Sequence, residues 1–292
     1  MRKIADPGGL KTWKDRKKTD LQGTQTENNP GNCQFSLCSL TPWIIGSRDF
    51  NDNPMPLSIQ GVRATHSHFF KLLDKSTTWE QRARTFQDYM EVAFHLHQWR
   101  KTGDPDGQVN LKHSYLRFLR GWLFNASSVE GAVMKGWVES RMGLVPTYHC
   151  GRIQGKESNE YLAYLKDRMG GASRTNAIFS QLDLLYEFVQ YEIQRRDPQV
   201  THITLFRGIY DFSEHEILAR TDNQRAVVRL NNLNSFTHDF ERAWEFGTFV
   251  MEVRVPVSKI FFDGSFLRAG ILRGEEEVLV IGGEYDITRR LV

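Results

Sequence analysis

The sequence predicts an α+β protein in which a mostly helical part comes first and a strand-rich part follows. Before Pro198, apolar residues recur at three- and four-residue steps, which is the spacing of amphipathic helices. After Pro198 they gather in short runs rich in Val, Ile and Phe, which are typical of strands. Because no change of composition marks a linker, we expect one continuous domain over residues 31–292, mostly helical over 31–198 and strand-rich over 199–292.

Residues 1–30 are polar, charged and rich in Gly, Asn, Thr and Gln. A segment of this composition cannot bury enough apolar surface to order itself, so we expect a flexible leader. Its basic residues would form a solvated tail or a docking arm for a partner.

Three helices are predicted from apolar spacing. The first runs from Ser76 to Trp99, with Thr77 or Thr78 as its cap and Glu80 in its first turn. The second passes through Tyr115, Leu119 and Trp122, and the third extends from Leu182 to Arg196.

Five strands are predicted after Pro198. They cover residues 202–207, 226–230, 249–253, 259–262 and 277–281. Gly282-Gly283 suits a two-residue hairpin turn into a further strand at residues 285–288.

Composition excludes several classes of function. Of 292 residues, 40% are apolar and 25% charged, and the formal net charge of +3 comes partly from the leader, so we do not expect a nucleic-acid partner. No run is long enough to span a membrane and no export signal is present, which favours a cytoplasmic protein. The three cysteines are Cys33, Cys38 and Cys150, a number and spacing that predict neither a disulfide framework nor a metal site.

Histidines are not grouped as metal ligands either. His66 and His68, like His95 and His97, are two residues apart, and such positions diverge on a helix. His149 has no further ligand nearby in the sequence. We therefore expect no metal site.

Three consecutive glutamates, residues 275–277, run directly into an apolar strand. Side chains alternate along a strand, so Glu275 and Glu277 would share one face, roughly 7 Å apart, and Glu276 would face away. Two neighbouring carboxylates repel each other, and a fold retains such a pair where a cation, or a group that becomes cationic, lies between them. The alternative is a solvated turn that enters an edge strand.

Two other strand ends carry candidate binding residues. Arg207 ends an apolar run and precedes Gly208, so its guanidinium could bind a phosphate and the glycine would let a ligand approach the backbone. Ser235 and Thr237 follow another run. Taken singly, Arg207 could instead form a salt bridge, and Ser235 could cap the helix expected over residues 239–246.

In this order, Phe206-Arg207-Gly208, Ser235-Phe236-Thr237 and Glu275-Glu276-Glu277 resemble the motifs of the arginine-specific mono-ADP-ribosyltransferases. The resemblance covers about residues 180–292. It implies an Arg-Ser-Glu triad on three strands, a split β-sandwich beside helices, and NAD bound in the cleft.

A closer resemblance runs from about residue 35 to residue 290. The segments 59–63, 135–141, 181–188, 230–233 and 279–283 are similar to those of the dinitrogenase reductase ADP-ribosyltransferases. This resemblance implies that ADP-ribose passes from NAD to an arginine of the nitrogenase iron protein, which inactivates nitrogenase. It further implies preference for the ADP-bound iron protein and regulation by a PII signalling protein. Trp137 and the Leu182 stripe would be core residues in any family.

The resemblance also implies residue roles. Glu277 would be the catalytic glutamate and would bind the 2′-hydroxyl of the nicotinamide ribose, while Glu275 would orient the incoming guanidinium. Arg207 would bind the NAD phosphates, with the Gly208 backbone near the nicotinamide amide.

Ser235 would orient Glu277 and the ribose, and Phe246 would stack on nicotinamide. The usual Ser-Thr-Ser is Ser235-Phe236-Thr237 here, which leaves the role of Thr237 open. The loop over residues 263–274 would face the protein substrate, although its Arg268 and Arg273 suit a target arginine poorly unless they meet acidic groups on the partner.

Two alternative functions remain open from the sequence. One is an NAD glycohydrolase, with water as the acceptor. The other is a non-catalytic binding module. The pair of repelling carboxylates, Glu275 and Glu277, argues against it, because a binding module has no reason to retain them. Oligomeric state is not readable from the sequence.

Overall fold

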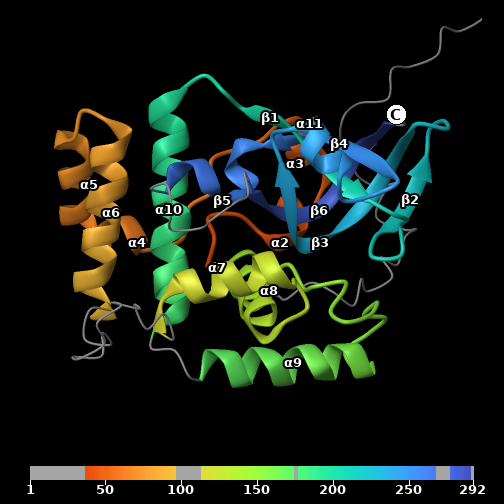
Figure 1. Cartoon of the computed structure of the whole chain (residues 1–292), viewed down its shortest axis with the longest axis horizontal. Coiled ribbons are helices and arrows are strands. Elements are labelled where there is room, and N and C mark those ends of the chain that lie inside the picture. The colour runs from red at the N-terminus through yellow and green to blue at the C-terminus, as the bar shows by residue number, and fades with distance from the viewer. Residues whose placement is uncertain (1–36, 97–112, 174–176, 268–276, 291–292) are drawn as a thin grey trace, which may run out of the picture. The chain divides into compact units, whose positions relative to one another are not determined.

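Helices form most of the earlier part of the chain and strands the later part (Figure 1). The computed structural model describes residues 37–96, 113–173, 177–267 and 277–290, all within one compact unit, Gly31–Val292. Within these ranges the α-helices are α2 (Pro42–Ile45), α3 (Arg48–Asp52), α4 (Val62–Thr65), α5 (Ser67–Lys75), α6 (Trp79–Ala93), α7 (Tyr115–Phe124), α8 (Val129–Met142), α9 (Asn159–Ala172), α10 (Ile178–Arg196) and α11 (Phe240–Trp244). The strands are β1 (His202–Ile209), β2 (Glu216–Arg220), β3 (Arg225–Thr237), β4 (Phe249–Pro256), β5 (Ile260–Asp263) and β6 (Glu277–Arg290). The predicted α+β class is confirmed, and the proposed leader, residues 1–30, lies outside the described residues.

The helix predicted over residues 76–99 is α6, and it is shorter than expected. Thr78 is its cap, because its hydroxyl accepts a hydrogen bond from the Gln81 backbone N–H. The helix ends at Ala93, and His95 then adopts a positive φ of 54°, a left-handed conformation that cannot continue a right-handed helix. The predicted positions 97–99 lie outside the described residues.

Helices α8 and α9 have no counterpart in the sequence prediction. In α8 the whole run from Gly131 to Val138 is buried, so the helix has no polar face and shows no amphipathic period. Figure 1 shows α8 between α9 and the sheet, which explains this burial. Ser128 and Ser158 cap the two helices with their hydroxyls, a local signal that the sequence does carry.

The carboxylates of α10 hold other helices in place. Asp183 binds Arg141 of α8, Glu187 binds Arg63 of α4, and Glu192 binds Arg82 of α6, with N–O distances of 2.7, 2.6 and 2.5 Å. These carboxylates are largely buried, so removing one arginine would leave a buried charge without its partner. Helix α10, which was predicted over residues 182–196, is therefore the central helix of this part.

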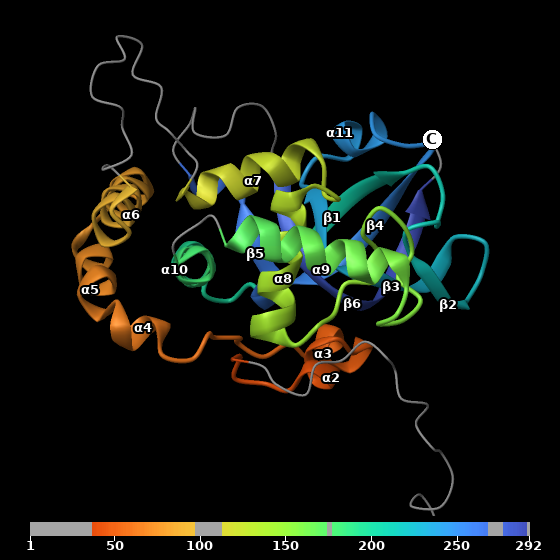
Figure 2. The ribbon, with the colours of Figure 1, turned by 90° about the horizontal axis from the view of Figure 1, so that it is seen from below.

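All six described strands belong to one antiparallel sheet with the order β2-β3-β1-β4-β6-β5. An additional pairing between β3 and β6 joins the strands β1, β4, β6 and β3 into a closed ring. Figure 2 shows α7 and α11 toward one side of the sheet and α2 and α3 toward the other. In this ring the ends of β1 and β3 meet the start of β6, which positions the site described below.

The predicted hairpin at Gly282-Gly283 is wrong, because β6 continues through both glycines. The pairing of β3 with β6 shifts between Leu230 and Leu233, which is a bulge in β3. A Cβ at position 282 would lie 1.7 Å from the Asn231 carbonyl oxygen, and Gly283 has a φ of +123°. The two glycines therefore let a continuous strand pass the bulge rather than turn.

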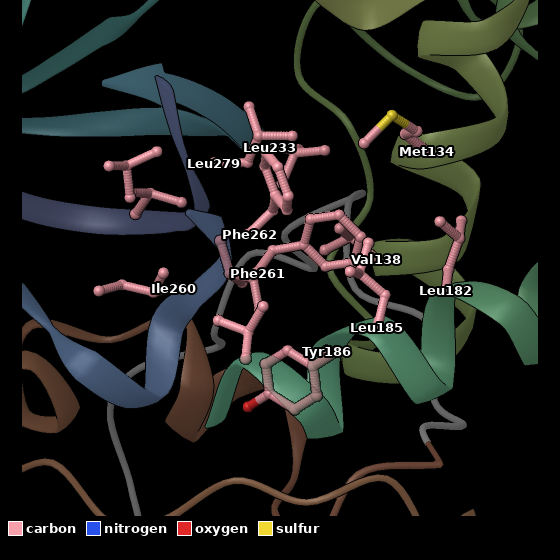
Figure 3. Close-up of a cluster of buried hydrophobic side chains, with 14 of the residues drawn as sticks. Met134, Val138, Leu182, Leu185, Tyr186, Leu233, Ile260, Phe261, Phe262 and Leu279 are labelled. Carbon is pink, nitrogen blue, oxygen red and sulfur yellow. The ribbon is translucent and has the colours of Figure 1, made fainter. Parts of the chain in front are cut away.

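The main core lies between α8 and α10 on one side and β5 and β6 on the other (Figure 3). Phe261 of β5 packs on Trp137 of α8, with ring centroids 4.7 Å apart, and Trp137 also contacts Tyr186 of α10. The Tyr186 hydroxyl donates to the Ser258 carbonyl at 2.8 Å, so its polar atom is satisfied inside the core. Trp137 and the Leu182 stripe are core residues, as expected.

Lys259 is fully buried directly before β5, at the end of a short 3-10 helix over Val257–Lys259. Its ammonium lies 4.7 Å from the Tyr285 ring centroid and donates to the Gly282 carbonyl at 3.3 Å. Burial lowers its pKa from 10.5 to about 7, with Glu284 opposing the shift. In the unfolded chain the lysine keeps its proton to a higher pH. Folding stability should therefore rise with pH between 7 and 10.5, because the unfolded state then binds the extra proton.

We expect the replacement Lys259→Met to raise the free energy of unfolding at pH 7 and to flatten its rise above pH 7. The replacement should reduce the slope of the free energy of unfolding against pH by up to about 1.4 kcal/mol per pH unit, which is the contribution of one bound proton. Denaturant unfolding from pH 6.5 to 9.5 measures it, and Lys166→Met, at an exposed lysine of α9, is the control. An unchanged slope in the Lys259 variant would contradict this assignment.

Candidate active site

Three strands bring together residues that are far apart in the sequence. Thr237 of β3 pairs with Phe206 of β1 on one side and with Glu277 of β6 on the other. Ser235 pairs with Leu279, so Ser235 and Glu277 occupy diagonal positions on one face of the β3–β6 pair. Arg207 follows Phe206 on β1. The predicted Arg, Ser and Glu therefore meet where three strands adjoin.

A pocket of about 290 Å³ opens at this junction. Its lining residues are Leu123, Phe206, Arg207, Gly208, Ser235, Phe236, Thr237, Arg242, Ala243, Phe246 and Glu277. Every predicted site residue that the structure describes is in this lining. Glu275 lies outside the described residues, as does most of the loop over residues 263–274.

The Arg207 guanidinium is held by the backbone of β3. One terminal nitrogen donates to the Ser235 carbonyl at 2.9 Å, and the other approaches the exposed Glu214 carboxylate at 3.3 Å. Its Nε is buried and has no hydrogen-bond partner in the described residues. The side chain is thus fixed in direction and retains donor capacity, a combination suited to an anionic ligand.

Glu277 begins β6 and is only 7% exposed. A carboxylate at this depth is costly unless positive or hydrogen-bonding groups surround it. The guanidinium side chains of Arg207 and Arg242 line the same pocket and supply positive charge. Glu277 therefore does not lie in a solvated turn, which was the alternative considered from the sequence.

The alternative role of Ser235 as a helix cap is wrong. Asp239 begins α11, and its carboxylate accepts from the Glu241 and Arg242 backbone N–H groups. The Ser235 hydroxyl instead accepts a hydrogen bond from the Trp122 indole at 2.9 Å. The Thr237 hydroxyl accepts from the Asp239 N–H at 3.2 Å, which gives it a local role in the turn before α11.

His215 is a buried residue near Arg207 that the sequence did not single out. It is 3% exposed, and neither ring nitrogen has a hydrogen-bond partner in the described part of the chain. Burial, and to a lesser degree the Arg207 charge, lower its pKa from 6.5 to about 3. The ring is therefore neutral at physiological pH and does not repel the Arg207 guanidinium.

Helix α11 packs directly over the end of β1. A Cβ at Gly208 would lie 2.0 Å from the Ala243 carbonyl oxygen and 3.0 Å from the Phe246 backbone. Phe246 lies just after α11, lines the pocket and is 52% exposed. Gly208 thus sets how closely α11 and Phe246 approach β1.

Replacing Gly208 with alanine should push α11 away from β1. We expect a loss of about 1–3 kcal/mol in the free energy of unfolding, the usual cost of overpacking. The NAD that the sequence resemblance implies should bind more weakly in the deformed pocket. Chemical unfolding and calorimetric titration measure the two effects. Gly155→Ala is a matched control because nothing lies within 4 Å of its added Cβ. Equal behaviour of the two variants would contradict the role given to Gly208.

Within the described ranges no group of three or more His, Cys, Asp or Glu side chains could hold a metal ion. His66 contacts the Tyr89 hydroxyl, and the buried His149 lies between Lys135 and Asp167. No helix in the described part of the chain is long and apolar enough to cross a membrane.

Comparisons with known proteins give one family. A sequence model of the family Dinitrogenase reductase ADP-ribosyltransferase (DRAT) matches residues 35–289. The chain is 40% identical over 264 residues to the NAD(+)--dinitrogen-reductase ADP-D-ribosyltransferase of Rhodospirillum rubrum, an alignment that covers 89% of this chain and 96% of that protein. No solved structure matches the chain significantly. The chain therefore belongs to the dinitrogenase reductase ADP-ribosyltransferase family.

Proposed function

We propose that this chain is an NAD-dependent enzyme that transfers ADP-ribose to an arginine of dinitrogenase reductase, the nitrogenase iron protein, and so inactivates nitrogenase. The observation that carries the proposal is the convergence of Arg207, Ser235 and Glu277 in one pocket, in a chain of this family. The relative from Rhodospirillum rubrum bears the name of the same activity and spans nearly the whole chain.

The residues of the pocket fit NAD. The diphosphate is anionic, and Arg207 and Arg242 bring two guanidinium groups to the lining. The two terminal nitrogens of Arg207 each carry a second N–H beyond their contacts with Ser235 and Glu214, and a phosphate oxygen would accept from them. Gly208 leaves its backbone accessible to the nicotinamide amide, and Phe246 offers a half-exposed ring for stacking.

Glu277 would supply the central electrostatic effect. As nicotinamide leaves, positive charge develops on the ribose, and a carboxylate fixed beside it stabilises that charge without reorganising. Glycosidases use carboxylates on the same kind of cation. Ser235 would orient the Glu277 carboxylate and the ribose relative to each other.

Glu275 would bind the guanidinium of the target arginine on the same face as Glu277, and the loop over residues 263–274 would contact the protein substrate. By family resemblance we further propose that the strands of this protein form a split β-sandwich and that the enzyme prefers the ADP-bound iron protein. We also propose that a PII signalling protein regulates it and that it is located in the cytoplasm.

A transfer assay tests the proposal. The protein is incubated with NAD labelled in its adenine, purified iron protein and ADP, and the label is then mapped by peptide mass spectrometry. We expect it on one arginine of the iron protein. Release of free ADP-ribose without labelled arginine would indicate a glycohydrolase, and no consumption of NAD would indicate a binding module. A parallel reaction with ATP in place of ADP tests the nucleotide preference.

A further inference from the structure

Helix α7 reaches the proposed active site through Trp122. This side chain is 3% exposed, and its indole N–H donates to the Ser235 hydroxyl oxygen at 2.9 Å. Its neighbour Leu123 lines the pocket. A residue of the helical part is thus bonded directly to a residue of the strand-rich site.

The bond limits how the Ser235 hydroxyl can turn. A serine hydroxyl has one donor and two acceptor positions, and an indole N–H can only donate. Once Ser235 accepts from Trp122, its own O–H must point in another direction. Because Glu277 is the diagonal neighbour of Ser235 on the same face, the remaining directions include that of the Glu277 carboxylate, beside which the ribose of the proposed substrate would lie.

Trp122 is itself held firmly. The Lys135 ammonium lies 5.9 Å from the indole ring centroid, and it donates to the Tyr148 carbonyl at 2.8 Å. The Lys135 carbonyl accepts from the Asn232 side chain of β3, so the helix behind Trp122 is bonded to the strand that carries Ser235. The indole and the hydroxyl are therefore both connected to α8, the indole through the Lys135 ammonium and the hydroxyl through β3.

We propose that Trp122 is a positioning residue that orients the Ser235 hydroxyl toward Glu277 and the reacting ribose. This inference rests on the proposed function of the pocket. It gives the helical part of the chain a direct role in the reaction, beyond support of the sheet.

Replacing Trp122 with phenylalanine keeps an aromatic ring and removes the N–H donor. We expect kcat for nicotinamide release and for arginine transfer to fall about five- to tenfold, the effect of one hydrogen bond, while KM for NAD stays within about twofold. A loss confined to KM would contradict the proposal, because the bond acts on catalytic geometry rather than on binding.

Trp137→Phe is a matched control for loss of stability. Trp137 is also buried, its indole donates to the Asp183 carboxylate at 2.8 Å, and neither residue is in the pocket lining. Its replacement should lower Tm at least as much as Trp122→Phe does, because a hydrogen bond to a carboxylate contributes more than one to a hydroxyl. It should leave kcat within about twofold, because Trp137 is not in the pocket lining. An equal fall of kcat in both variants would assign the effect to stability and overturn the proposal.

A double-mutant cycle tests whether Trp122 acts through Ser235. Once Ser235→Ala has removed the hydroxyl, the further change Trp122→Phe should alter kcat by less than about twofold, because coupled residues are not additive. If Trp122→Phe lowers kcat by the same factor in the wild-type background and in the Ser235→Ala background, the proposal is wrong.

The bond can also be observed without activity. In protein labelled with ¹⁵N-tryptophan, the indole signal that disappears in Trp122→Phe should move in Ser235→Ala, and the Trp137 signal should not. If that signal moves but the wild-type enzyme cleaves no NAD, the proposed function fails and the hydrogen bond stands. If NAD is cleaved but the Trp122 signal does not respond to Ser235→Ala, the positioning role fails alone.

Discussion

Replacing Glu277 with glutamine is expected to reduce both ADP-ribose transfer and NAD cleavage by about a hundred- to a thousandfold, the range found when one preorganised electrostatic group is removed from an active site. Glutamine matches glutamate in size, so the pocket should keep its shape. It has no negative charge to offset the charge that develops on the ribose as nicotinamide leaves. Because Glu277 is nearly buried, water cannot replace that charge effectively.

Initial rates of nicotinamide release and of arginine labelling measure the two activities, and thermal unfolding checks the fold. Glu284→Gln is a suitable control, since Glu284 lies further along β6, binds Arg229 at 3.0 Å and is not in the pocket lining. It should retain activity within about twofold, because a partly exposed ion pair contributes little. Transfer by the Glu277 variant at a rate near that of the wild type would refute the catalytic role of this carboxylate.

The parts of the fold that could be predicted from sequence are those with a local signal. Helices α6 and α7 each bury one stripe and expose another, so their spacing is visible in the chain. Helix α10 is buried on all sides from Gln181 to Val189, and its spacing is visible because Gln181, Asp183 and Glu187 interrupt its apolar residues. Helix α8 is buried nearly all round and has no such period. The two glycines of β6 suggested a turn, although Gly282 makes room for the Asn231 carbonyl of β3 and Gly283 adopts a positive φ within the strand.

The site was predictable for a different reason. Residues 207, 235 and 277 have no local relation, and only the order of their motifs resembles a known class. The register of β1, β3 and β6 then places them around one pocket. Trp122 carries no motif and reaches Ser235 across 113 residues of sequence, so only a tertiary structure reveals their hydrogen bond.

Replacing Glu275 is expected to affect cleavage of NAD and transfer to arginine differently. Glu275 lies outside the described residues, so its role rests on the expectation from the sequence that strand alternation would place it on the face of Glu277. A carboxylate there would attract and orient the guanidinium of the target arginine. It would not be needed to stabilise the ribose, because Glu277 is proposed to do so. Cleavage of NAD and transfer to arginine should therefore depend differently on this residue.

The replacement Glu275→Gln should lower transfer to the iron protein about a hundredfold or more, the loss expected when a charged partner that positions the acceptor is removed, and should leave slow cleavage of NAD by water. Glu276→Gln is the matched control, since the neighbouring carboxylate would face away. Both activities are followed in one reaction, as labelled arginine and as free ADP-ribose. If transfer survives in the Glu275 variant, acceptor recognition lies elsewhere in the 263–274 loop. If cleavage also disappears, Glu275 acts on the ribose as well, and the separate roles proposed for the two carboxylates are wrong.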